Sequence, residues 1–100
     1  MGSRPEVTDP ALLLLISLAA GPKHGHAMLL DVARFAGIRL GPGTLYGALS
    51  RLVEDGHVEP LPPDGRRRPY RLTRAGRRLL EARLGGLSRA VRTGLERVGA

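Results

Sequence analysis

The most informative segment of the sequence is HVEPLPPDGRRRPYRL at residues 57–72. Two short segments with strand character flank the Pro-Pro-Asp-Gly sequence at 62–65, which is a strong turn signal. The returning segment alternates, with Tyr70 and Leu72 on one face. Pro60 restricts the first segment to an edge or an end of a sheet. We therefore predict a two-stranded hairpin whose tip and returning arm carry four arginines.

The residues before the hairpin predict a helix over 42–55. Pro42 suits the first position of a helix, and Gly56 suits its end. Polar and small residues face outward, whereas the apolar residues recur at helical spacing on the other side. These apolar residues are Leu45, Leu49, Leu52 and Val53. The helix can therefore pack on a core and present its outer face to a partner.

Two further helices are expected nearer the N-terminus. Asp9 is a suitable N-cap for an apolar helix over 10–20, which should be buried on most sides. Residues 24–36 have apolar positions at helical spacing and predict the second helix. The alternating residues 38–40 are enough for a very short strand.

A long helix is expected after the hairpin, with Thr73 as its N-cap. Its apolar residues keep one stripe for about five turns. They are Leu80, Leu84, Leu87, Val91, Leu95 and Val98. A chain of 100 residues cannot easily cover so long a stripe by itself, so a second copy is the expected partner. Glycines at 85, 86 and 94 interrupt the helix and favour a kink or stabilisation by dimerisation.

The predicted order is helix, helix, short strand, helix, strand, turn, strand, helix. This is a mostly α fold with a small β-hairpin, of the α+β class, and it matches a winged helix-turn-helix followed by a C-terminal dimerisation helix. Residues 1–8 are expected to be a flexible lead, 9–73 a DNA-binding domain and 74–100 the dimerisation helix. The helix that starts at Pro42 would enter the major groove, and the basic hairpin would contact phosphates or the minor groove.

Positive charge is concentrated in the last 40 residues. The net charge is +7, but residues 1–60 carry −1 and residues 61–100 carry +8. Lys23 is the one lysine among 16 cations, and the planar guanidinium of arginine suits phosphate and groove contacts. These charges predict a polyanionic partner, most commonly nucleic acid, although a solvated basic surface or an anionic membrane as partner would give the same pattern.

Composition excludes several other classes. There is no cysteine, which rules out a disulfide framework and a thiolate metal site. His24 and His26 are two apart and do not face each other on a helix, so no metal is expected. No nucleophile–base grouping or phosphate-binding glycine loop indicates an enzyme or a cofactor. The apolar run 11–20 is too short for a bilayer and lacks a signal peptide's basic start, so we expect a cytoplasmic protein without a membrane partner.

Residues 11–80 resemble the PadR family of winged-helix transcriptional regulators. The matching stretches are GPKHG at 21–25, LGPGTLYGAL at 40–49, RLVEDG at 51–56 and GRRRPYRLTRAG at 65–76. The resemblance implies a homodimer joined through the C-terminal and first helices, and a repressor of palindromic operators that a small-molecule effector often releases. Because the C-terminal helix of this chain is short, the chain resembles the compact members of the family, which lack a larger C-terminal domain for a ligand. Two departures are Gly41, where the family usually has serine, and His26, where it often has tyrosine.

Candidate residues follow from the element order, the charges and this resemblance. The DNA-contacting set comprises Lys23, His26, Pro42, Gly43, Thr44, Tyr46, Arg51, Arg66, Arg67 and Arg68. The dimer-contacting set comprises Leu12, Leu15, Leu80, Leu84, Leu87, Val91 and Leu95. Tyr46 and Thr44 have packing or capping as alternative roles, and Arg51 and Arg71 can each pair with Glu54 or Glu59.

Two other functions stay open from the sequence. One is a winged-helix module that binds another protein, with an incidental basic hairpin. The other is an architectural protein that binds DNA without sequence preference, which would show a steep salt dependence and little discrimination between sequences.

Overall fold

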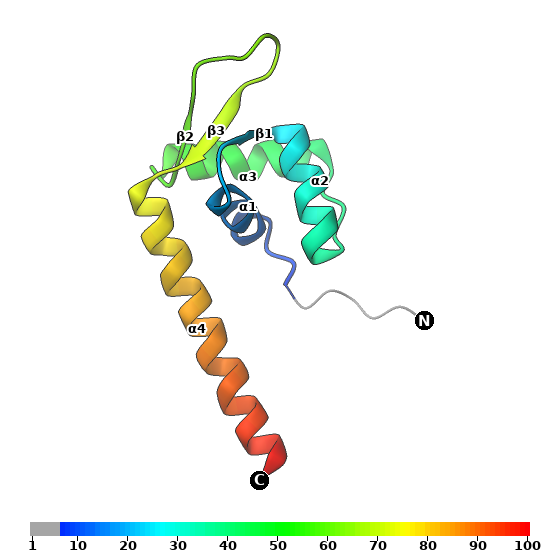
Figure 1. Cartoon of the computed structure of the whole chain (residues 1–100), viewed down its shortest axis with the longest axis vertical. Coiled ribbons are helices and arrows are strands. Elements are labelled where there is room, and N and C mark those ends of the chain that lie inside the picture. The colour runs from blue at the N-terminus through cyan, green and yellow to red at the C-terminus, as the bar shows by residue number, and fades with distance from the viewer. Residues whose placement is uncertain (1–6) are drawn as a thin grey trace.

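The computed structural model describes residues 7–100 and has the α+β architecture expected from the sequence (Figure 1). Four helices and a small antiparallel sheet form within this range, and the hairpin and the end of the last helix project at opposite ends of the molecule. The elements are α1 (Pro10–Ala19), β1 (Lys23–His24), α2 (Gly25–Ala36), α3 (Pro42–Glu54), β2 (Val58–Pro60), β3 (Pro69–Leu72) and α4 (Arg74–Gly99). Most of the expected flexible lead, namely residues 1–6, lies outside the described residues.

Helix α1 lies at the centre of the core. It begins as predicted, with the Asp9 carboxylate accepting from the backbone N–H of Ala11 and with proline at the first position. Its leucines are buried on several sides because α2, α3, α4 and β3 all contact this helix. The buried residues of α1 are Leu12, Leu13, Leu14, Leu15, Ser17 and Leu18. Within residues 7–100, no helix is both long and apolar enough to cross a membrane.

Helices α2 and α3 pack on α1 and form the two helices of the helix-turn-helix. In α2, His24 is the N-cap and Gly37 ends the helix in the left-handed conformation, with φ 69°. In α3, Leu45, Leu49 and Leu52 turn inward, which confirms three members of the predicted stripe. No side chain caps α3, because glycine stands at position 41.

The sheet contains a strand that the sequence did not predict. Strand β3 is central, and it pairs antiparallel with β2 on one side and with β1 on the other. The predicted strand at 38–40 is wrong: Ile38 and Leu40 are half-buried against the core without strand pairing. The free edge of β3 is instead occupied by Lys23 and His24. The hairpin is therefore part of a three-stranded sheet.

The hairpin extends beyond its regular strands into a narrow tip. Asp64 and Arg67 exchange two backbone hydrogen bonds, of 2.7 and 3.1 Å, around the turn. Gly65 has φ 63°, a left-handed conformation that favours glycine and permits the tight reversal. The chain reverses at 64–67, two residues beyond the turn predicted at 62–65, and this places three consecutive arginines at the tip and start of the returning arm.

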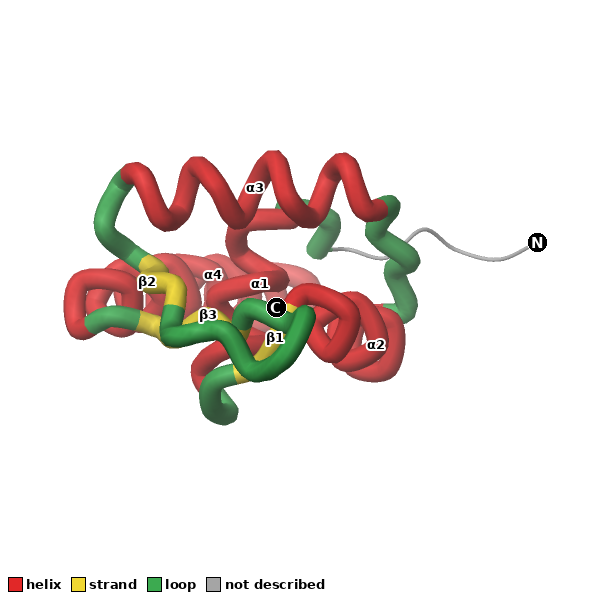
Figure 2. Tube along the Cα trace, turned by 90° about the horizontal axis from the view of Figure 1, so that it is seen from above, coloured by secondary structure: helices red, strands yellow, loops and turns green. Residues whose placement is uncertain are grey.

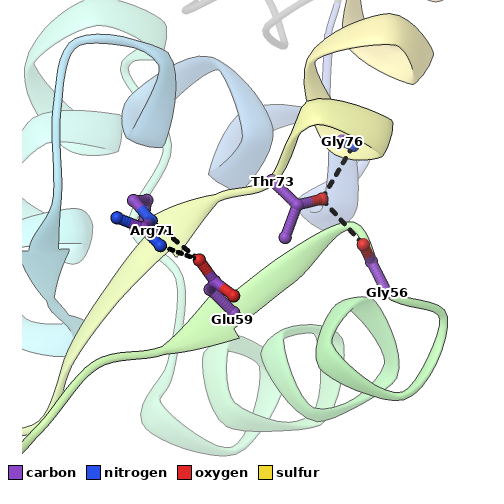
Figure 3. Close-up of polar contacts among 5 residues, drawn as sticks. All are labelled: Gly56, Glu59, Arg71, Thr73 and Gly76. Carbon is purple, nitrogen blue, oxygen red and sulfur yellow. Dashed lines mark hydrogen bonds and ion pairs between the residues drawn. The ribbon is translucent and has the colours of Figure 1, made fainter.

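A compact polar junction joins the hairpin to α4 (Figure 3). The Thr73 hydroxyl donates to the Gly56 carbonyl at 2.7 Å and accepts from the Gly76 N–H at 3.0 Å, so it caps α4 as predicted. A Cβ atom on Gly76 would lie 2.0 Å from the His57 carbonyl oxygen, which explains the glycine at this position. Across the strands, Arg71 Nε donates to Glu59 Oε1 at 2.8 Å.

Helix α4 is continuous over 26 residues, so its three predicted interruptions do not break it. Near its start, Arg83 forms an ion pair with Asp9, which ties α4 to the beginning of α1. Burial alone would raise the pKa of Asp9, but the hydrogen bond and charge of Arg83, together with the N–H groups of Ala11 and Leu12, hold that pKa below its ordinary value. The first turns of α4 are therefore fastened to the core.

The predicted dimer-contacting set contains a buried group and an exposed group of residues. Leu12, Leu15 and Leu80 are at most 5% exposed within one chain and belong to its own core. They have almost no surface left to give to a partner. The remaining members are open, and their exposed fraction rises from 41% at Leu84 to 69% at Leu95. Leu87 and Val91 lie between them in the stripe. Any interface on this stripe therefore centres on the distal half of α4.

Candidate nucleic-acid interface

Helix α3 presents small residues to solvent near its start, and its apolar stripe is buried beneath them. Figure 2 shows α3 along one edge of the molecule, with its outer side uncovered. Pro42, Gly43 and Thr44 are exposed at its start. A Cβ atom added at Gly43 or Gly47 would meet nothing within 4 Å. Without larger side chains here, the helix backbone can come close to a flat or grooved partner.

Tyr46 lies on the side of α3 that faces the hairpin. Its side chain is half exposed, and its ring packs over the start of α2. A Cβ atom on Gly25 would lie only 2.6 Å from the Tyr46 hydroxyl oxygen. A larger side chain at position 25 would therefore displace the end of the Tyr46 ring from the start of α2.

The hairpin arginines are exposed, and two of them approach other polar groups of the chain. Arg68 Nη1 donates to the Leu61 carbonyl across the hairpin at 2.9 Å. Arg67 Nη1 lies 3.3 Å from His24 Nε2, so the hairpin contacts the start of α2. Arg66 is exposed beside them. In contrast, Arg71 is paired with Glu59, one of the two partners considered from the sequence.

The start of α2, the side of α3 and the hairpin meet at one cleft of about 230 Å³. The residues around it include five of the ten predicted DNA-contacting residues. Its lining consists of His24, Gly25, His26, Tyr46, Arg66, Arg67, Arg68 and Tyr70. None of these residues is a carboxylate, and three are arginines. The cleft is therefore a concentrated positive surface, which favours an anionic ligand.

Lys23 was expected to contact DNA, but its side chain makes its contacts within the chain. Its ammonium group donates to the Ser17 carbonyl and lies 3.7 Å from the Asp31 carboxylate. The Ser17 hydroxyl also donates to Asp31 at 2.7 Å, which completes a small network between α1, β1 and α2. The lysine side chain is only 19% exposed, so its charge is turned toward the chain rather than outward.

Thr44 and Arg51 lie on the side of α3 away from the hairpin. Together with Gly47 they line a separate groove of about 480 Å³ between α3, the start of α1 and α4. Both residues are exposed and stay candidates for contacts at the flank of α3. They do not join the arginine cleft.

Sequence reasoning missed the contributions of Gly25 and Tyr70 to the cleft. Each depends on β1 pairing with β3, which brings Lys23 opposite Tyr70 and His24 opposite Pro69. A two-residue strand leaves no periodic signal, so the pairing could not be predicted from spacing. Across residues 7–100, no group of three His, Cys, Asp or Glu side chains is placed to hold a metal ion.

Comparison with known families gives a match over most of the chain. The model of the transcriptional regulator PadR-like family matches residues 13–82. A curated relative, an uncharacterised 37.1 kDa protein in transposon TN4556 of Streptomyces fradiae, is 48% identical over 81 residues. The match covers 81% of this chain but only 24% of that relative, so the chain spans about a quarter of its length.

Solved structures share the fold. RosR of H. salinarum is 27% identical, with a TM-score of 0.72 and coverage of 82% of this chain and 74% of that chain. A PadR family transcription regulator from hypervirulent Clostridium difficile R20291 is 19% identical, with a TM-score of 0.78 and coverage of 93% and 100%, respectively. At that identity, the second likeness concerns the fold alone.

Proposed function

Because the chain belongs to the PadR-like family of transcriptional regulators, we propose that it acts in the cytoplasm as a homodimeric repressor that binds a palindromic DNA operator. The family consists of regulators rather than enzymes, and it supports a role in DNA binding. In this proposal, α3 reads base edges in the major groove and the arginine hairpin contacts the backbone or the minor groove. Release by a small-molecule effector stays a prediction from the family resemblance.

The observation that carries the proposal is the convergence of α3 and the hairpin at the arginine cleft. Tyr46 on α3 and Arg66–Arg68 on the hairpin line the same cleft, although Tyr46 and Arg66 are 20 positions apart in the chain. Cationic side chains beside an exposed helix supply backbone contacts, which hold the helix in register on a duplex. The open surface at Gly43 and Gly47 lets α3 approach the groove closely.

The distal half of α4 supports the dimer. Leu84, Leu87, Val91 and Leu95 form an exposed apolar stripe on a helix that extends away from the core (Figure 1). A second copy of this helix would cover the stripe with the same residues, as a twofold interface requires. Such a dimer presents two α3 helices, and binding across half-sites about one helical turn apart is then expected.

The decisive experiment is a selection of bound sequences from a random duplex library, followed by a salt titration of the selected duplex. We expect a symmetric site, bound at least about a thousandfold more tightly than unrelated DNA. Selection without a preferred sequence, together with a steep salt dependence, would establish the architectural protein instead. No duplex affinity even at low salt would leave the protein-binding module as the remaining function.

A triple variant tests the hairpin within the same assay. Replacing Arg66, Arg67 and Arg68 by alanine should weaken binding broadly and flatten the salt dependence. The matched control removes the same charge from α4, at Arg89, Arg92 and Arg97, which lie off the apolar stripe. Equal affinity of the hairpin variant and the wild type in a gel-shift titration would show that the hairpin does not contact DNA.

A further inference from the structure

His24 has donors at both of its ring nitrogens. Its Nδ1 accepts from the backbone N–H of Ala27 at 3.3 Å and caps α2, while Arg67 Nη1 lies 3.3 Å from its Nε2. A neutral imidazole has one acceptor nitrogen and one N–H, and a guanidinium can only donate. One of the two contacts therefore cannot be a hydrogen bond within the protein.

The cap determines which nitrogen carries the proton. The Ala27 N–H is part-buried and belongs to the first turn of α2, whereas Arg67 is exposed to water. Leaving this part-buried N–H without an acceptor costs more than leaving an exposed guanidinium to solvent. Nδ1 thus stays the acceptor and Nε2 carries the proton. His24 Nε2–H and Arg67 Nη1–H are then two donors side by side with no acceptor between them.

We propose that His24 and Arg67 form a clamp for one non-bridging oxygen of a DNA backbone phosphate, with both groups donating to that oxygen. The clamp rests on the proposed function, and it assigns to His24 a role in DNA binding alongside its role as a cap. The surrounding cleft provides arginines and the exposed Tyr46 hydroxyl but no carboxylate, so an anion must come from outside the lining residues. A phosphate oxygen accepts two such charge-assisted bonds readily.

The clamp also links the start of α2, which is fixed within the chain, to the tip of the hairpin, which is exposed. His24 belongs to the start of α2 and is fixed by the cap and by its pairing with Pro69. Arg67 lies at the tip of the hairpin, where it is exposed. A phosphate held between them would fix the hairpin tip relative to α2 on the bound duplex.

The test uses His24→Asn and Arg67→Gln with the selected duplex. Asparagine caps a helix well but is too short to place a donor where Nε2 lies, so His24→Asn removes the clamp and keeps the cap. Single phosphates of the duplex are replaced in turn by uncharged methylphosphonates. At one phosphate in each half-site, the replacement should weaken wild-type binding about tenfold and weaken binding of either variant less than about twofold. His57→Asn serves as the matched histidine control.

The outcomes separate the clamp from the proposed function. A selected duplex that wild type and His24→Asn bind equally, or a methylphosphonate pattern that is the same for both, overturns the clamp and leaves the repressor intact. Failure of the wild type to bind any duplex overturns both. In the free protein, NMR of the imidazole nitrogens should show the Nε2-protonated form of His24, and an Nδ1-protonated ring would also overturn the clamp.

Discussion

Helices α1 and α4 are both rich in leucine, yet they bury it in different ways. Four consecutive leucines of α1 are covered on all sides, because three other helices and a strand pack around them. In α4, Leu80 is buried but Leu87, two turns later, is 43% exposed. The first helix satisfies its apolar surface within one chain, whereas the last helix leaves it open.

The difference shows that an apolar sequence does not by itself distinguish a core from an interface. What distinguishes them is the number of elements that the chain can bring to each helix, and a chain of 100 residues covers one helix fully and the second only near its base. We therefore expect variants of α1 to act on folding alone and variants of the distal half of α4 to act on association alone.

Leu87→Asp should have the largest effect, on association. A twofold dimer contains two copies, so the variant loses the remaining burial of two leucines, each 43% exposed in one chain, and places two carboxylates in an apolar contact. Together these changes cost on the order of 5 kcal/mol. Sedimentation should show monomers at concentrations where the wild type is dimeric, while the fold of each chain is kept. An intact dimer in the variant would refute the interface proposed on α4.

Leu14→Ala should destabilise the fold by about 2–5 kcal/mol, because the side chain is fully buried in α1. Chemical denaturation measures this loss. We expect the same loss of stability whether the wild type and the variant are compared as monomers or as dimers. A change in dimer affinity without a change in chain stability would contradict the assignment of α1 to the core.

Gly76→Ala should cost about 1–3 kcal/mol by overpacking, since its Cβ would press on the His57 carbonyl oxygen. Gly94→Ala is the matched control in the same helix, and its Cβ meets nothing within 4 Å. Because alanine favours helices, the control should gain up to about 1 kcal/mol. Thermal melts should therefore shift in opposite directions, and a shared direction would rule out a crowded junction at Gly76.

Asp9→Asn should have the smallest effect, about 0.5 kcal/mol or less at neutral pH, because the Asp9–Arg83 pair is partly exposed and asparagine still caps α1. The pKa of Asp9 is lowered on folding, so its stabilisation is complete above the ordinary pKa and is lost as the pH falls through the folded value. The variant should lose stability less steeply on acidification than the wild type. Parallel stability curves in acid would contradict this linkage.

The helices could be predicted from the sequence because each carries its own signals. Asp9 and Pro10 predict the start of α1, Pro42 predicts the start of α3 and Thr73 predicts the start of α4. Each of these helices begins where predicted. Strand β1 has no such signal, since two residues form a strand only because the edge of β3 accepts them. Residues 38–40 alternate between apolar and polar side chains, as a strand would, but no strand lies beside them to pair with.

The candidate site was predictable in part for the same reason. The run of arginines is visible in the sequence, and so is the exposed face of α3. The inward turn of Lys23 is not visible, because its partners Ser17 and Asp31 come from two different helices. The position of His24 beside Arg67 likewise depends on a contact across 43 residues of chain.

The junction at Thr73 connects the orientation of α4 to the surface that α3 and the hairpin present, which we propose binds DNA. One hydroxyl fastens the end of α3, at Gly56, to the first turn of α4. A helix of 26 residues is about 39 Å long, so a tilt of about 10° at this junction displaces its far end by about 7 Å. Conversely, the angle at which two α4 helices cross in a dimer sets the separation of the two α3 helices. The contacts that hold the first turns of α4, at Thr73, Leu80 and Arg83, would therefore govern which half-site spacing the proposed dimer can span.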